Sequence, residues 1–171
     1  MNEERARVLN DGLWIGLIGY VTVALVTGVL DVLRGASFFY TPAVLGGALF
    51  GRAGPVAVTP EVVFPYNGVH LLTFLAIGML IAVLVREVEL HPVLWFLAFF
   101  VLLGMFFYSL ALIGAIGAEA GPGVPWTSIL VADAAAAVAM GVFVRSRHPG
   151  LWRAMRDESD PEATEDETQA G

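Results

Sequence analysis

The chain has 171 residues, of which 57% are hydrophobic and only 15% are charged, and it contains no cysteine. A typical soluble domain has about 45–50% apolar and about 25% charged residues, so this composition excludes a soluble enzyme built around one packed core. The lack of cysteine also excludes disulfides, thiolate metal ligands and a cysteine nucleophile. The composition instead indicates a polytopic membrane protein.

Four stretches are apolar and long enough for a membrane-crossing helix, because about 20 residues span the hydrocarbon core. They cover residues 13–33, 69–85, 92–117 and 126–144. The predicted fold is therefore all-α, a bundle of four transmembrane helices.

The connection between the first two spans holds an apolar segment, residues 37–51, that is too short to cross the bilayer. Thr41 and Pro42 predict a helix start, with threonine as N-cap and proline in the first turn, and hence a half-helix over residues 42–50. It either lies flat in the interface, which we favour slightly, or is re-entrant and shielded by protein. Residues 52–67 contain three prolines and are expected to be irregular.

Small residues mark the faces through which the spans are expected to pack, since lipid gives apolar helices no reason to associate. Gly12, Gly16 and Gly19 form such a face in the first span, and alanines dominate the fourth. The third span is rich in phenylalanine, and we expect its aromatic side chains to face lipid and to pack against the alanine-rich fourth span.

Charged residues set the orientation and define a tail. Seven of the nine arginines flank one side of the four spans, and only Arg34 and Arg52 lie on the other. Since arginine favours the cytoplasmic side, both termini are expected in the cytoplasm and the protein in the plasma membrane. Seven of the sixteen acids lie within residues 157–171, without a base among them. We therefore predict a transmembrane domain over residues 1–156 and a disordered acidic tail over residues 157–171.

Asp133 is the most informative polar residue, because it lies about two turns into the fourth span among alanines. Insertion of an aspartate near a helix centre costs about 2.5–3.5 kcal/mol, so Asp133 is expected to face the bundle interior and to meet a polar group. His70 is the first choice of partner, and Tyr66 and Thr73 on the same face of the second span are alternatives. The contact would be either an interhelical hydrogen bond or a proton or cation site.

Four residues fall in the outer half of the predicted bundle and form a candidate polar cluster: Asp31, Tyr66, His70 and Asp133. One histidine and two carboxylates would suit a divalent metal or a proton relay, although the spacing identifies no metal. Asp31 also lies three residues before Arg34, and an ion pair between these two accounts for it equally well.

No cofactor is expected. A bis-histidine haem needs two histidines at one depth, whereas His70 lies near the outer end of the second span, His91 opens the third from the inner side and His148 follows the fourth. The sequence contains no Walker, nucleophile-elbow, zinc-protease or dinucleotide-binding motif, so we expect neither an enzyme nor a nucleic-acid partner.

These observations favour an integral membrane protein whose partners are the lipid bilayer and other membrane subunits or itself. It would act as a small accessory subunit or as a self-associating bundle. The alternative is a small proton- or cation-linked transporter or channel that uses the outer-leaflet polar cluster around Asp133.

Overall fold

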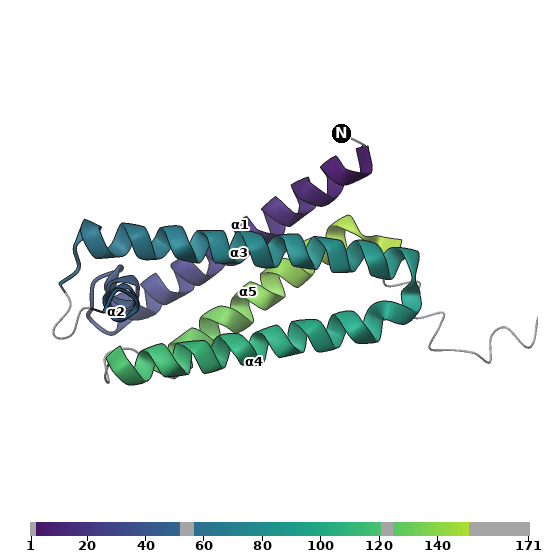
Figure 1. The fold of residues 1–171 in the computed structure, drawn as a ribbon. Coiled ribbons are helices and arrows are strands. Elements are labelled where there is room, and N and C mark those ends of the chain that lie inside the picture. Colours follow the sequence, from purple (N-terminus) through teal and green to yellow (C-terminus); the bar gives the residue numbers. More distant parts are fainter. Residues whose placement is uncertain (1–2, 52–56, 121–124, 151–171) are drawn as a thin grey trace, which may run out of the picture.

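The computed structural model describes residues 3–51, 57–120 and 125–150. Over these residues the chain is all-helical, as predicted (Figure 1). The elements are α1 (Glu3–Leu33), α2 (Tyr40–Leu49), α3 (Pro60–Leu90), the single 3-10 turn η1 (Pro92–Leu94), α4 (Trp95–Ala120) and α5 (Trp126–Arg147). The predicted acidic tail, residues 157–171, lies outside the described residues.

Three of the helices, α1, α3 and α5, are long and apolar enough to cross a membrane. They contain the predicted spans 13–33, 69–85 and 126–144. The third predicted span lies in η1 and α4, a 26-residue helix of mostly apolar side chains. A crossing by α4 remains a prediction.

Helix α3 begins at Pro60, so the prediction of an irregular chain up to residue 67 was wrong from that point on. Pro60 lies in the first turn, where a missing N–H removes no helical hydrogen bond. Pro65 lies inside the helix, where its missing N–H removes one backbone hydrogen bond. Val62 and Val63 are buried on the same two turns, and their burial offsets that loss.

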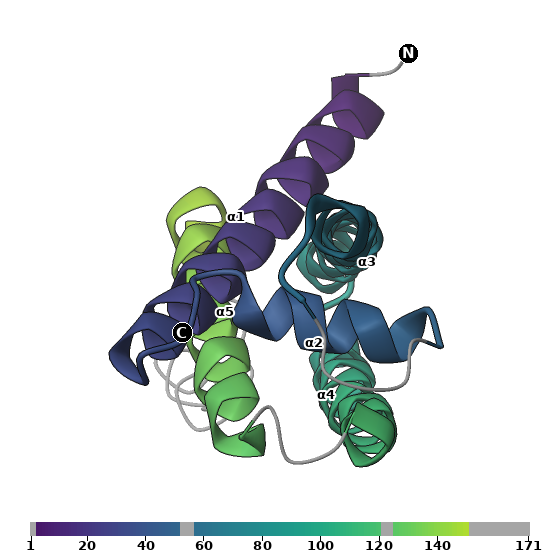
Figure 2. The same ribbon diagram turned by 90° about the vertical axis from the view of Figure 1, so that its left-hand side faces the viewer.

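Helix α1 is the centre of the arrangement, because both α3 and α5 pack against it and run antiparallel to it (Figures 1 and 2). Val23 of α1, Phe74 of α3, and Ala132 and Ala136 of α5 form one buried apolar cluster. The core therefore lies where these three helices meet.

The crossing of α1 and α3 depends on glycine, as the small residues of the first span predicted. A Cβ atom built on Gly78 would lie 2.3 Å from the carbonyl oxygen of Gly12 and 2.4 Å from the backbone nitrogen of Gly16. The two backbones thus touch at a distance that only glycine on both helices allows.

Helix α4 is held at its two ends. Near its start, Trp95 and Ala98 pack against Val85 and Val88 of α3. Elsewhere it packs against α2, which lies between α3 and α4 in Figure 2. Among the described residues, α4 makes no extensive contact with α5, so the predicted packing of the aromatic span on the alanine-rich span was wrong. At one end of the bundle α2 lies between α3 and α4, and further along α4 the side chains of Phe99 and Phe100 are exposed.

Helix α2 lies across the ends of the long helices: Figure 1 shows it end-on while α3 and α4 run across the view. It occupies Tyr40–Leu49, where the sequence predicted a half-helix over residues 42–50. Its side chains from Ala43 to Gly47 are buried. Thr41 is not its N-cap as predicted, because the helix begins two residues earlier than expected, at Tyr40, and Phe39 is the N-cap residue, without a side-chain hydrogen bond.

Candidate functional site

Asp133 lies on α5 between the buried residues Ala132 and Ala136. Its side chain is half-buried, and its Oδ2 atom is buried without a hydrogen-bond partner among the described residues. The carboxylate therefore points into the protein, where a charged oxygen without a partner is costly. This unsatisfied oxygen is the clearest chemical feature of the core.

Tyr66 and His70, two of the predicted partners of Asp133, lie one turn apart on α3. Tyr66 is within reach of the negative charge on Asp133. Its ring stacks on that of His70, with centroids 5.5 Å apart and planes 17° apart. His70 also contacts the rings of Phe74 at 5.0 Å and Tyr20 at 5.9 Å. The spacing of four residues from Tyr66 to His70 to Phe74 places these rings on one face of α3.

The structure shows no hydrogen bond from His70, the expected first partner, to Asp133; the imidazole instead lies among three aromatic rings. Thr73 is engaged within its own helix, since its hydroxyl donates to the carbonyl oxygen of Val69 at 2.9 Å. Of the three predicted partners, Tyr66 is the one on which the charge of Asp133 acts, through space rather than through a hydrogen bond to Oδ2.

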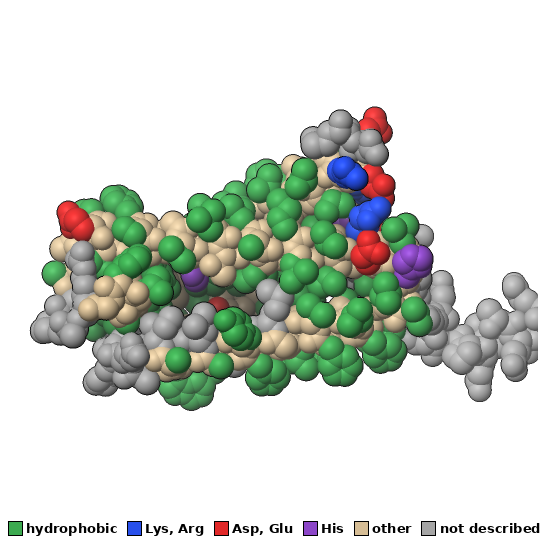
Figure 3. Space-filling view, in the orientation of Figure 1, with side chains coloured by type: hydrophobic (Ala, Val, Ile, Leu, Met, Phe, Trp, Pro, Cys, Tyr) green, Lys and Arg blue, Asp and Glu red, His purple; other side chains and the backbone are tan. Residues whose placement is uncertain are grey.

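The molecular surface is hollowed between α3 and α4, and Figure 3 shows a histidine and an acidic side chain within this hollow.

Asp31, the fourth member of the predicted cluster, has a different setting. Its carboxylate is 1% exposed and accepts two hydrogen bonds from Thr41, one from the backbone N–H at 2.8 Å and one from the hydroxyl at 2.9 Å. The expected ion pair with Arg34 is present at 3.5 Å, and the Arg34 guanidinium also donates to the Ser128 hydroxyl of α5. Asp31 thus joins α1 to α2 and, through Arg34, to α5.

The arrangement of these groups does not point to a metal. In residues 3–51, 57–120 and 125–150, no three histidine, aspartate or glutamate side chains converge in a way that could hold a metal ion. The Asp133 carboxylate can accept a hydrogen bond, a proton or a cation on Oδ2, which has no partner within the described part of the chain.

A second polar cluster, which the sequence did not suggest, lies at the opposite ends of α1, α3 and α5. Asp11 is 2% exposed, and its carboxylate lies 3.3 Å from Nη2 of Arg147 and 3.5 Å from Nε2 of His148. Nδ1 of His148 lies 2.7 Å from the Glu89 carboxylate. The imidazole therefore connects α1 with α3. One feature could have indicated it: Asp11 directly precedes Gly12, at the start of the glycine face of the first span.

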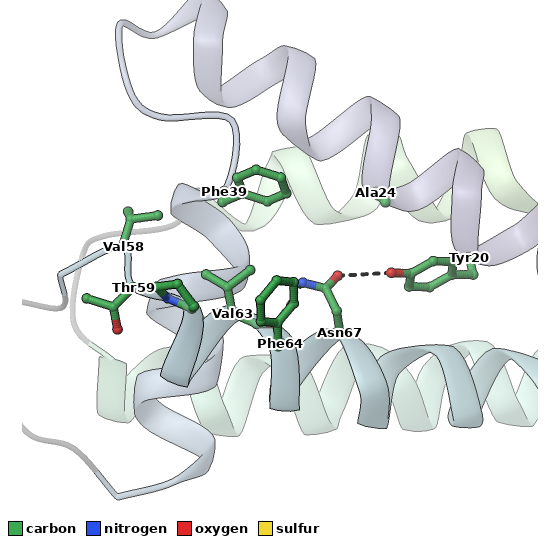
Figure 4. A pocket seen from close by; sticks show the side chains of 9 residues that line it. Tyr20, Ala24, Phe39, Val58, Thr59, Val63, Phe64 and Asn67 are labelled. Carbon is green, nitrogen blue, oxygen red and sulfur yellow. Dashed lines mark hydrogen bonds between the residues drawn. The ribbon is translucent and has the colours of Figure 1, made fainter.

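A pocket of about 400 Å³ lies between α1 and α3 (Figure 4). At one end the Tyr20 hydroxyl donates to the Asn67 side-chain oxygen at 3.2 Å, and the Asn67 amide donates to the Val63 carbonyl oxygen at 2.8 Å. Ala24 and Phe39 line the pocket as well. The sequence placed Tyr20 and Asn67 in separate segments and predicted neither their pairing nor the pocket.

Compared with known protein families, curated proteins and solved structures, the chain shows no match.

Proposed function

We propose that this chain is an integral membrane protein that acts by association rather than catalysis, as a small accessory subunit of a membrane complex or as a self-associating bundle. In this proposal α1, α3, α4 and α5 cross the plasma membrane and both termini are cytoplasmic. Because α2 lies across the ends of the long helices, it would lie in the outer interface.

The uncovered face of α5 carries this proposal. Ala132 and Ala136 are buried on one side of the helix, whereas Ala134, Ala137 and Gly141 are exposed on the other. A Cβ atom built on Gly141 would meet nothing within 4 Å. In lipid, small residues allow the close backbone approach that holds helices together. The exposed face therefore supports docking of a further helix from a partner or a second copy.

A pair of matched substitutions tests the association. Gly141→Leu adds bulk to the exposed face of α5, while Gly104→Leu makes the same change at an exposed position of α4 that also has nothing within 4 Å. In mild detergent, size-exclusion chromatography with light scattering should show the wild-type chain as a homo-oligomer or a stoichiometric complex. We expect Gly141→Leu to release a monomer and Gly104→Leu to leave the assembly intact. A wild-type chain that is monomeric and without a partner would refute the proposal.

The second candidate is a proton- or cation-linked transporter or channel, and it is favoured by the Oδ2 atom of Asp133, which is buried without a hydrogen-bond partner among the described residues. A buried carboxylate within a span is a frequent feature of ion and proton pathways. Proteoliposomes that contain a pH-sensitive dye would show a proton flux that depends on the chain and is lost in Asp133→Asn. Absence of any proton or alkali-cation flux in the wild-type chain would exclude this candidate.

A further inference from the structure

The pocket between α1 and α3 is a wedge that opens away from their crossing point. At the crossing, a Cβ atom built on Gly16 would lie 2.6 Å from the carbonyl oxygen of Phe74. One turn further along α1, Tyr20 still reaches Asn67 through the hydrogen bond of 3.2 Å. Beyond this pair, Ala24 and Val63 line a cavity of 400 Å³. The helices have separated there, and the small side chain of Ala24 leaves the space between them open.

The chemistry of the walls selects an apolar occupant. Apart from the Tyr20–Asn67 pair and Thr59, the lining consists of hydrophobic side chains (Ala24, Phe39, Val58, Pro60, Val63 and Phe64). At the deep end the Tyr20 hydroxyl and the Asn67 amide already donate hydrogen bonds within the protein, so a polar ligand group is not required there. Thr59 lies at the other end, in the extended chain just before α3. The pocket therefore suits a molecule that is apolar along the part inside the pocket and polar at the end that lies outside it.

The position of the pocket indicates which such molecule is available. Tyr20 and Ala24 lie in the middle of α1, which is long and apolar enough to span a membrane. Phe64, at the side of the pocket, is 73% exposed, and Phe39 is 48% exposed. In a bilayer these side chains would contact lipid tails at the mouth of the wedge.

We propose that the pocket binds one acyl chain of a phospholipid from the surrounding bilayer. The chain enters between α1 and α3 past Phe64 and ends at the Tyr20–Asn67 pair, and the ester region of the lipid lies near Thr59. This assignment rests on the proposed membrane insertion of α1 and α3, but it does not depend on association or transport by the protein.

Photolabelling of the full-length chain tests this binding site directly. The protein is reconstituted into phosphatidylcholine vesicles in which a fraction of the lipid carries a diazirine within one acyl chain. After irradiation, mass spectrometry locates the adducts. Val21 and Leu25 lie on the exposed side of α1 near Ala24, and they report contact with bulk lipid. We expect Ala24 and Val63 to be labelled at least as strongly as these two residues.

A matched pair of variants shows whether the labelling comes from the pocket. Ala24→Phe fills the space, and Ala111→Phe makes the same change at an exposed position of α4. Labelling of Val63 should fall several-fold in the first variant and be unchanged in the second. If Ala24→Phe does not fold, the labelling ratio within the wild-type chain is sufficient. Adducts at Val21 and Leu25 without adducts at Ala24 and Val63 would overturn the binding site alone. Absence of adducts at all four residues would overturn the membrane insertion and the binding site together.

Discussion

The Asp31 carboxylate accepts both the backbone N–H and the hydroxyl of Thr41, at 2.8 and 2.9 Å, and so fixes the start of α2 to the end of α1. The first N–H groups of any helix have no partner within that helix. Here the partner comes from the preceding helix rather than from an N-cap residue. Arg34 adjoins the same carboxylate and offsets its charge. A buried aspartate in an apolar chain is thus explained by a structural role.

Removal of this carboxylate should loosen the junction between α1 and α2. We expect Asp31→Ala to lower the free energy of unfolding by about 2 kcal/mol, because a buried N–H and hydroxyl lose their acceptor. Asp31→Asn keeps one side-chain oxygen and should cost less. Thermal unfolding in detergent, followed by circular dichroism, measures both changes. An Asp31→Ala variant as stable as the wild type would show that the junction does not depend on these bonds.

The contact of α1 with α3 gives a prediction with an internal control. Gly78→Ala places a Cβ atom 2.3 Å from the Gly12 carbonyl oxygen, so the helices must move apart. Overpacking of this kind costs about 1–3 kcal/mol. Gly68→Ala makes the same change on α3 at a position with nothing within 4 Å, and it should stabilise the helix by up to about 1 kcal/mol. Equal effects of the two substitutions on unfolding would contradict the close approach at Gly78.

The parts of the fold that follow from local composition were predictable. Apolar runs of sufficient length predicted the helices, and the spacing of Gly12 and Gly16 predicted a face for close packing, which the approach of Gly78 confirms. The predicted start of the helix over Pro60–Leu90 was too late in the sequence, because Pro65 suggests an irregular chain. The burial of Val62 and Val63 that offsets this proline is a tertiary effect.

The settings of the polar residues were harder to predict, since they depend on which helices become neighbours. Asp31 falls in the same half of the bundle as Asp133, but α2 folds back onto it and takes up its carboxylate through Thr41. His70 has the depth expected of a partner for Asp133, yet the rings of Tyr20, Tyr66 and Phe74 surround it. The spacing of residues along the sequence predicts how deep a side chain lies in the membrane and on which face of its helix it lies. It does not predict which side chains of neighbouring helices it contacts.

The cluster at the other end of the bundle should contribute to stability through His148. His148→Ala removes the group that lies between Asp11 and Glu89 and leaves Arg147 as the remaining donor to the buried Asp11. We expect a loss of about 1–2 kcal/mol in the free energy of unfolding. His91→Ala is the control, because His91 is an exposed histidine that also ends a helix. A loss of similar size in both variants would mean that the contacts of His148 are not responsible.

The proposed topology predicts that the ends of α4 and of the chain lie on opposite sides of the membrane. A reporter that is active only in the cytoplasm should be active when fused at the C-terminus and inactive when fused at Glu119. A reporter that is active only outside should give the reverse pattern. The expectation rests on the arginine asymmetry and on α1 running antiparallel to both α3 and α5. Activity of the same reporter at both sites would exclude a crossing by α5, the helix between the two sites, and with it the four-span topology.

The last prediction compares Asp31 with Asp133 by substitution of each with leucine. In Asp133→Leu no hydrogen bond to Oδ2 is lost, because the structure gives that atom no partner within the described chain. Replacement of an unsatisfied polar group by an apolar one should therefore leave the free energy of unfolding unchanged or raise it by about 1 kcal/mol.

Asp31→Leu loses both bonds from Thr41 and the ion pair with Arg34, so it should lower the free energy of unfolding by about 2 kcal/mol or more. If Asp133→Leu is destabilised to the same degree, Asp133 has a structural partner that the isolated chain does not show. If it is as stable as the wild type, its behaviour in membranes decides between the proposed functions. If the wild-type chain gives a proton flux that Asp133→Leu loses while its assembly stays intact, the transporter is favoured. If the wild-type chain gives no flux and Asp133→Leu loses the assembly, a partner that binds at Asp133 is favoured.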